Sequence, residues 1–318
     1  MTGLCAVFRK ELSDHFSSYR FVILFALIAM VSFITSYMAG MQLSDNLEAL
    51  SKTRFPYLML FSTPGAVFSM VQFVAFFGPL IGLVLGFDSI NRERAHGTLI
   101  KIVSQPIFRD AVINGKFLAG VVTILVMLVA IVMVITGFGL SIVGIVPTFE
   151  EIWRIAVYLI MSVFYISLWL GVSILFSIAF RSIATSALAS VALWIFLSFF
   201  VTLGAEAVAD SIAPIEKQDV QAETIMRNVR IKEGLSLLSP MVLYSEATTT
   251  IIDPMRKTTG TMLFMTPLEQ ILSSRFQNPL SLSQSLIVVF PHVTALIALT
   301  LICFAVSYIL FMLQEIRS

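Results

Sequence analysis

The chain has 318 residues, of which 58% are hydrophobic and 12% are charged, and its formal net charge is +1. Soluble domains contain about 25% charged residues, so this chain has too little polar surface to cover a soluble fold and is expected to lie in lipid. The near-zero net charge argues against a nucleic-acid-binding protein, and the two cysteines, Cys5 and Cys303, argue against a disulfide framework.

Residues 1–19 are predicted to form a cytoplasmic, amphipathic helix in the membrane interface. Apolar residues recur there at helical spacing and share one broad face, while Arg9, Lys10 and Asp14 point elsewhere. The apolar residues are Leu4, Val7, Phe8, Leu12 and Phe16. Such a helix lies in the interface before the chain turns into the first span; the alternative is an ordinary charged tail.

Six apolar runs have the length and polarity of membrane-spanning helices, which predicts an all-α integral membrane protein. About 20 apolar residues in a helix cross a ~30 Å hydrocarbon core. The runs are roughly 21–41, 64–87, 117–146, 155–180, 183–203 and 286–313. None of them contains Asp, Glu, Lys or Arg. This absence disfavours an ion-coupled carrier or a channel, because such proteins usually place ionisable side chains at membrane depth.

The distribution of Lys and Arg in the short loops predicts the orientation. One side carries Arg9, Lys10, Arg20, Arg92, Arg94, Lys101, Arg109, Lys116, Arg181 and Arg317. The other side carries only Lys52, Arg54 and Arg154. Because Lys and Arg favour the cytoplasmic side, both termini are expected in the cytoplasm, and the chain is expected to be a multi-pass protein of the cell membrane.

The long segment 205–285, between the fifth and sixth spans, is expected to be a small helical extracytoplasmic region. Residues 219–238 have amphipathic helical spacing, and a second short helix is expected near 243–252. The region either caps the bundle or is a docking surface for an extracytoplasmic accessory protein or for a substrate. The predicted domains are residues 1–19, residues 20–204 with a loop at 88–116, residues 205–285 and residues 286–318.

The cytoplasmic loop 88–116 is predicted to carry a short helix that docks on a partner. Gly97 permits a turn, Thr98 is a good N-cap, and Pro106 ends the helix. Its apolar face consists of Leu99, Ile102 and Val103. Its charged neighbours are Arg92, Glu93, Arg94 and Arg109. A helix of one or two turns is not stable alone in water, so it needs a groove on another protein; the alternative is a basic turn that only sets the topology.

This loop resembles the cytoplasmic loop of type-2 ABC exporter permeases. The resemblance rests on Glu93-Arg94-x-x-Gly97-Thr98-Leu99, Ser104-x-Pro106-x-x-Arg109 and Gly115-Lys116. The start with Arg9-Lys10-Glu11-Leu12, the six spans and the large loop before the last span are also similar. A further motif, Ser239-Pro240-x-x-Leu243-Tyr244 with Ala247-Thr248, resembles the branch with the nitrous-oxide-reductase maturation permease and the sodium-efflux permeases.

The resemblance implies that the chain is the transmembrane permease subunit of an ATP-driven exporter. Its partners would be a separate ABC ATPase subunit, which binds ATP and Mg, and a second permease subunit in a homodimer or heterodimer. Loop 88–116 would be the part that couples to the ATPase. The chain itself contains no G-x-x-x-x-G-K-[ST] motif. We therefore expect no catalytic, cofactor-binding or metal-binding residues in it, and do not expect it to be an enzyme.

A stripe of small residues in the second span is predicted to pack against another helix. Gly78, Gly82 and Gly86 recur at every fourth position, and this spacing lets two helix backbones approach closely. The contact is either ordinary packing within one subunit or a close or sliding contact near the translocation path.

A second class of function is left open by the sequence. The chain would then be a non-transporting membrane scaffold or sensor, whose external region binds a partner and whose loop transmits the signal. A neighbouring gene for an ATP-binding subunit would favour the exporter, and a neighbouring kinase or regulator gene would favour the scaffold.

Overall fold

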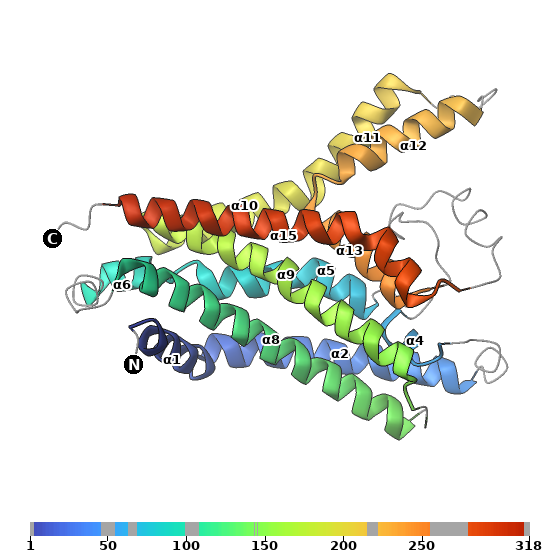
Figure 1. The fold of residues 1–318 in the computed structure, drawn as a ribbon, viewed down its shortest axis with the longest axis horizontal. Coiled ribbons are helices and arrows are strands. Elements are labelled where there is room, and N and C mark those ends of the chain that lie inside the picture. The colour runs from blue at the N-terminus through green and yellow to red at the C-terminus, as the bar shows by residue number, and fades with distance from the viewer. Residues whose placement is uncertain are drawn as a thin grey trace.

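Six long helices form a bundle, with shorter helices at its ends (Figure 1). The computed structural model describes residues 3–45, 55–62, 69–98, 108–142, 144, 146–214, 222–254 and 279–314. All regular elements within these residues are helices. Six of the helices are long and apolar enough to cross a membrane, so the prediction of an all-α protein with six spans is confirmed.

The spans and the shorter helices alternate along the chain. The spans are α2 (Tyr19–Asp45), α5 (Met70–Gly86), α8 (Arg109–Ile142), α9 (Phe149–Ala179), the unit α10–η1–α11 and α15 (Leu282–Leu313). The shorter helices are α1 (Gly3–Phe16), α4 (Met59–Ser62), α6 (Asn91–Ala95), α12 (Ala222–Ser236) and α13 (Pro240–Ile252). Within the fifth span, α10 (Ile183–Ile195) passes through a π-helical turn, η1 (Phe196–Phe200), into α11 (Val201–Ile212).

Polar caps fix where two of the long helices begin. Before α5 and α9, a Ser or Thr hydroxyl accepts a hydrogen bond from the backbone N–H three residues later, and the side chain at that later position reaches back. The pairs are Ser69 with Gln72 and Thr148 with Glu151. Glu151 also accepts a hydrogen bond of 2.9 Å from the N–H of Tyr57, which ties the start of α9 to the segment before α4.

Helix α9 lies at the centre of the bundle. It packs against α5, α8, α10, α13 and α15, and its Trp169 and Tyr165 are fully buried. The ring of Tyr165 stacks on that of Tyr244 in α13, with centroids 4.3 Å apart, and the Tyr244 hydroxyl lies 2.7 Å from Ser162 Oγ. Helix α13 is therefore part of the packed core. The sequence placed these residues in a cap or a docking surface, because they follow a turn and lie outside the long apolar runs.

Helix α13 also brings a carboxylate into the bundle, where it pairs with a histidine of α15. Glu246 of α13 lies 3.2 Å from the ring nitrogen of His292 in α15, and the two side chains are 7% and 11% exposed. The six apolar runs contain no acidic residue, so their composition alone did not indicate this buried carboxylate. It comes from a short helix outside the spans that packs against them.

Two helix boundaries differ from those expected from apolar runs. Helix α8 begins at Arg109, so the end of the predicted loop 88–116 forms the first two turns of a helix. Charged residues do not end a helix, and Asp110 in the first turn is favourable near the positive end of the helix dipole. Likewise, the fifth span continues as α11 into the segment 205–285.

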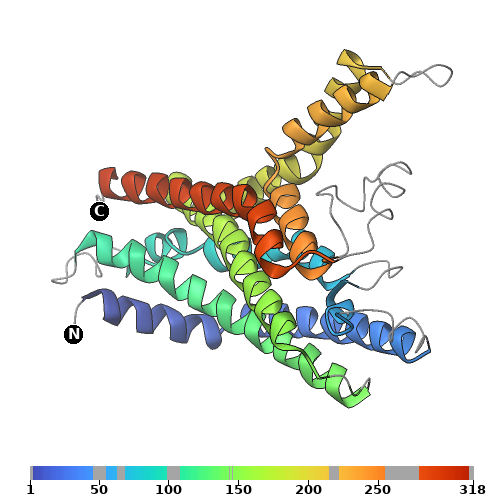
Figure 2. The ribbon, with the colours of Figure 1, turned by 45° about the vertical axis from the view of Figure 1, so that its right-hand side comes forward.

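Helices α11 and α12 form a hairpin that projects away from the bundle (Figures 1 and 2). The side-chain amide of Asn228 donates to Asp210 Oδ1 at 3.0 Å and to the carbonyl of Ala213 at 2.9 Å. Lys232 pairs with Glu206 at 2.9 Å. Helix α12 lies within the range 219–238 that was predicted to be helical, and these polar contacts close the hairpin.

The bundle has two distinct ends. Helices α1 and α6 and the last turn of α15 lie at the same end (Figure 1), which we call the terminal end. At the opposite end, the fully buried guanidinium of Arg154 in α9 donates to the carbonyls of Ile251 and Leu280, at 2.9 and 2.7 Å. The sequence counted Arg154 among loop residues, but in the structure it holds α9 to the last turn of α13 and to the segment just before α15.

Candidate functional site

The predicted coupling region lies at the terminal end and is anchored to the central helix. After α5 the chain makes a turn, and α6 follows at once. The N–H groups of Ile90 and Asn91 both donate to Ser177 Oγ of α9, at 3.0 and 3.1 Å. The side-chain amide of Asn91, a fully buried residue, donates to the carbonyl of Ser182 at 3.4 Å. The start of α6 therefore has a fixed position on the end of α9.

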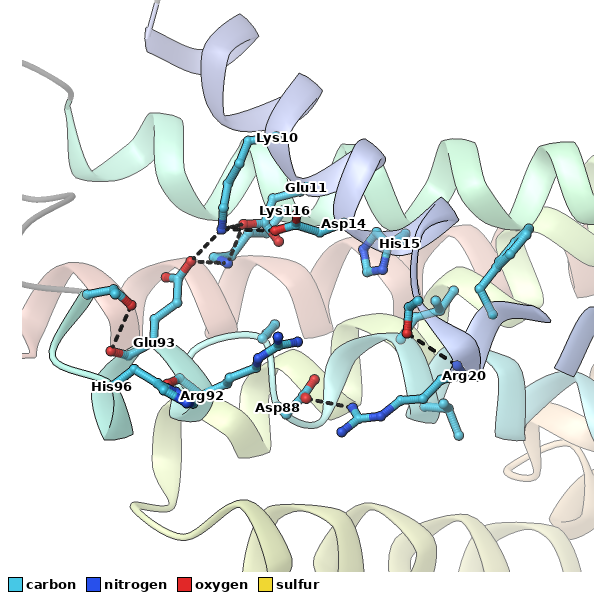
Figure 3. Close-up of a pocket in the computed structure, with 16 residues that line it drawn as sticks. Lys10, Glu11, Asp14, His15, Arg20, Asp88, Arg92, Glu93, His96 and Lys116 are labelled. Atoms are coloured by element: carbon cyan, nitrogen blue, oxygen red, sulfur yellow. Dashed lines mark hydrogen bonds and ion pairs between the residues drawn. The ribbon is translucent and has the colours of Figure 1, made fainter. Parts of the chain in front are cut away.

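An ion cluster with three buried members joins α6 to two other helices (Figure 3). The ammonium of Lys116 in α8 lies 2.8 Å from the carboxylate of Glu11 in α1 and 2.9 Å from that of Glu93 in α6. The side chains of Lys116, Glu11 and Glu93 are 4%, 10% and 9% exposed. Lys10 pairs with both carboxylates, at 2.8 and 3.2 Å. We call these four residues the ion cluster.

The charges of the ion cluster stabilise one another. Burial alone would raise the pKa of Glu11, but the ammonium groups of Lys116 and Lys10 outweigh it and hold this pKa below its ordinary value of 4.5. For Lys10, burial would lower the pKa, and the carboxylates of Glu11 and Glu93 outweigh it, so the pKa is raised. Buried charges are tolerated only when they are paired. The three buried charges, Lys116, Glu11 and Glu93, therefore hold α1, α6 and α8 together while they are paired.

Close packing brings α1 onto the first turns of α8. A Cβ atom added at Gly115 of α8 would lie 2.8 Å from a methyl group of Val7, and Val7 is buried. Glycine at this position therefore lets α1 approach α8 closely enough for Glu11 to reach Lys116. The position of α1 in a membrane interface stays a prediction.

A second ion pair ties the start of α2 to the turn after α5. Arg20 Nη1 lies 2.6 Å from Asp88 Oδ2, and the guanidinium of Arg20 also lies over the ring of Phe87, 5.1 Å from its centroid. Asp88 is buried, while half of the Arg20 side chain is exposed. The turn that precedes α6 thus contacts the first span as well.

Two of the predicted arginines meet at the end of the last span. Arg94 of α6 donates to the side-chain oxygen of Gln314 at 2.7 Å, and Arg109 of α8 donates to its backbone carbonyl at 3.2 Å. The Gln314 amide in turn donates to the carbonyl of Ile178 in α9 at 3.2 Å. Gln314 therefore joins α6, α8 and α9 at the point where α15 ends.

The structure describes only part of the predicted docking helix. Gly97 has a φ of +65°, and no described atom lies within 4 Å of a Cβ added there, so it forms the predicted turn. The hydroxyl of Thr98 donates to the carbonyl of Glu93 at 3.2 Å, and Arg92 is exposed. The remaining predicted residues, Leu99, Ile102, Val103 and Pro106, lie outside the described residues. The Thr98 N-cap and the apolar face stay predictions.

The glycine stripe of α5 packs against α9 of the same chain. A Cβ atom at Gly82 would lie 2.5 Å from the carbonyl oxygen of Ile166 and 2.7 Å from the backbone nitrogen of Leu170. One at Gly78 would lie 3.1 Å from the Ile166 side chain, and one at Gly86 would overlap the Ser173 hydroxyl. The Ser173 hydroxyl donates to the Gly82 carbonyl at 3.1 Å. The two backbones are therefore in direct contact within one subunit.

The sequence singled out Glu93 as a site residue, whereas Glu11 and Lys116 were not singled out and stood within motifs of the family resemblance. Glu11 lies four residues after Val7 on the apolar side of the amphipathic helix, where a carboxylate requires a buried counterion. Lys116 directly precedes a long apolar run. These two signals were present, but only the structure shows that Lys116 pairs with both Glu11 and Glu93. Among the described residues, no group of three His, Cys, Asp or Glu side chains is placed to hold a metal ion.

Comparisons with known proteins agree with this architecture. Residues 5–316 match the model of the family described as ABC-2 family transporter protein. A protein of Pseudomonas aeruginosa named "Probable ABC transporter permease protein NosY" is 36% identical over 93 residues, 28% of this chain and 31% of the relative. A protein of the same name from Stutzerimonas stutzeri is 28% identical over 140 residues, 44% of each chain. The chain thus aligns with less than half the length of these relatives.

Proposed function

Because the chain belongs to the ABC-2 transporter family, we propose that it couples ATP hydrolysis by a separate ATPase subunit to the export of a substrate. The family assigns the chain as a multi-pass membrane subunit of an ABC transporter. The ATPase subunit binds ATP and Mg. A second permease subunit, identical or related, completes the membrane part of the complex.

The observation that carries this proposal is the attachment of α6 to four other helices. Glu93 is held to α1 and α8 through the ion cluster, and Ser177 of α9 accepts hydrogen bonds from the start of α6. Arg94 reaches the end of α15 through Gln314. A push on α6 is therefore transmitted to α1, α8, α9 and α15 as a rigid-body displacement.

The ATPase subunit docks, in this proposal, on the terminal end. The turn at Gly97 and Thr98 follows α6 directly, and both residues are exposed, so a partner has access to them. The excess of Lys and Arg at this end supports a cytoplasmic location for it and for both termini. Outward transport is the direction expected for the exporters that the chain resembles.

A pair of glycine substitutions tests the docking site. Gly97 and Gly144 both have positive φ, +65° and +69°, and neither has a described atom within 4 Å of an added Cβ. A Val at either position costs about 1–2 kcal/mol of backbone strain, and its Cβ meets none of the described residues. Only Gly97 lies next to α6, whereas Gly144 lies between α8 and α9.

We expect Gly97→Val to reduce the binding of the ATPase subunit, or the ATP hydrolysis of the purified complex, while Gly144→Val leaves both unchanged. Binding is measured by co-purification of the two subunits from detergent, and hydrolysis by phosphate release. If both variants behave like the wild type, the loop does not contact an ATPase. The scaffold or sensor function would then be the better explanation.

A further inference from the structure

A pocket at the terminal end lies beside the contacts of the proposed coupling and shares the ion cluster and Thr98 with them. It has a volume of about 290 Å³ and lies between α1, the first turn of α2, the end of α5, α6 and α8 (Figure 3). The ion cluster forms one of its walls. Small-molecule pockets usually range from about 300 to 1,000 Å³. The pocket is thus large enough for a small polar group and too small for an extended molecule.

The pocket is strongly charged but balanced. Its lining contains four basic side chains, Lys10, Arg20, Arg92 and Lys116, and four acidic ones, Glu11, Asp14, Asp88 and Glu93. A purely anionic ligand would gain no net attraction from this set. A ligand that carries a positive and a negative group at separate positions matches it better, because each group can face the opposite charge.

Two of these charges are exposed and are not held by an ion pair closer than 3.3 Å. Arg92 is exposed, and its guanidinium has no hydrogen-bond partner among the described residues. Asp14 pairs only at 3.3 Å with Lys10, and its side chain is 59% exposed. Arg92 comes from α6 and Asp14 from α1 (Figure 3). By contrast, the carboxylate of Asp88 is taken by Arg20, and the ion cluster satisfies Lys116.

The pocket is lined in part by apolar residues that belong to two spans. Phe21, in the first turn of α2, and Val84 and Leu85, near the end of α5, line it. The next residues of α2, Val22 and Ile23, are 54% and 66% exposed. The polar pocket therefore lies beside the start of α2 and the end of α5, two membrane-spanning helices. A ligand with a polar head and an apolar tail can contact both the charged and the apolar residues of this arrangement, whereas a free polar ion contacts only the charged ones.

We propose that the pocket binds the headgroup of a phospholipid that carries both a phosphate and a primary amine. The phosphate pairs with Arg92, which offers the planar set of N–H donors that suits phosphate oxygens. The ammonium donates to the carboxylate of Asp14. The acyl chains lie outside, along the exposed side of α2. Burial lowers the pKa of His15 in the same pocket. This ring therefore stays neutral near pH 7 and adds no positive charge to those of the four basic side chains.

The full-length chain, purified in mild detergent, provides the test. It is mixed with phosphatidylethanolamine, phosphatidylglycerol or phosphatidylcholine with identical acyl chains, and native mass spectrometry measures the lipid that stays bound. We expect preferential retention of phosphatidylethanolamine, because phosphatidylglycerol has no cation and the choline group has no N–H to donate. Arg92→Ala and Asp14→Asn should each lower this retention by about threefold, as expected for a partly exposed charge pair.

Arg181→Ala is the matched control. Arg181 is exposed near the end of α9 and does not line the pocket, so it should leave retention unchanged. Equal retention of the three lipids, or preference for phosphatidylglycerol, would overturn the proposal. Soluble phosphoethanolamine that binds as tightly as the lipid would show that the source is a free metabolite. Loss of the lipid whenever an ATPase subunit is bound would instead assign the pocket to that protein.

Discussion

The ammonium of Lys116 lies 2.9 Å from the carboxylate of Glu93, although the first belongs to a membrane-spanning helix and the second to the short helix α6. The same ammonium lies 2.8 Å from Glu11 of α1. One buried cation therefore holds three separate helices at the terminal end. In the proposed transporter this contact connects the docking region to the spans.

The first prediction concerns the strength of this contact. Lys116→Met should destabilise the chain strongly, by up to about 3–5 kcal/mol, because it leaves buried carboxylates without their main counterion. Adding Glu93→Gln should restore part of the loss, since one of the unpaired charges is removed. The two effects should thus be non-additive by about 0.5–3 kcal/mol in a double-mutant cycle, measured by unfolding of the purified chain.

The pair Lys232 and Glu206 serves as the control for this cycle. It has the same 2.9 Å separation, but its side chains are 27% and 46% exposed. Its coupling energy should be below about 1 kcal/mol. Additive effects of Lys116→Met and Glu93→Gln, or equal coupling in the two pairs, would contradict a special role for the buried cation.

The second prediction concerns the contact between α5 and α9. Gly82→Ala should destabilise the chain by about 1–3 kcal/mol, because its methyl group meets backbone atoms that cannot turn away. Gly78→Ala should cost less, since it meets the side chain of Ile166. Gly137→Ala in α8 meets no described atom within 4 Å and should stabilise the helix by about 0.5–1 kcal/mol. Thermal unfolding gives the order, and equal effects at the three sites would refute the close contact.

The third prediction concerns the opposite end. Arg154→Met keeps much of the side-chain volume but removes the donors to the carbonyls of Ile251 and Leu280. Each buried carbonyl left without a partner costs about 1–3 kcal/mol, so the unfolding temperature should fall clearly. Arg181→Met, at an exposed position, is the comparison. A similar unfolding temperature for the two variants would show that Arg154 does not tie this end together.

The fourth prediction concerns acid. The folded-state pKa of Glu11 is held below 4.5, so its contribution to stability is present above this value and is lost as the pH falls through the lower folded-state pKa. The unfolding temperature of the wild type should therefore drop more steeply below pH 4.5 than that of Glu11→Gln, which has no carboxyl to protonate there. Parallel curves for the two proteins would mean that Lys116 and Lys10 do not stabilise the Glu11 carboxylate.

Local patterns were sufficient to predict much of the fold. Apolar run length predicts the six spans, and the four-residue spacing of Gly78, Gly82 and Gly86 predicts a close helix contact, because both signals are properties of a single segment. The partner of the stripe, α9, could not be deduced, since no local pattern specifies which helix provides the facing backbone.

The candidate site depends more on long-range contacts. Arg92, Glu93, Arg94 and Gly97 stand out within one loop, but Glu93 shares the ammonium of Lys116 with Glu11 only because α1 folds back onto α8. The burial of Glu246 could not be predicted for a related reason. Helix α13 is too short to be recognised as a span, yet it packs against α5, α9 and α15. Which residues meet over such long distances along the chain is decided by how the helices pack, and no local sequence pattern shows it.

The central claim is that this chain works with a separate ATPase subunit, and purification from its native host tests it most directly. The tagged chain is isolated in mild detergent, and the co-purified proteins are identified by mass. The account predicts a stoichiometric partner with a G-x-x-x-x-G-K-[ST] motif, whose recovery falls in Gly97→Val but not in Gly144→Val. Recovery of the intact chain without any such ATPase, under conditions that preserve known ABC complexes, would contradict it.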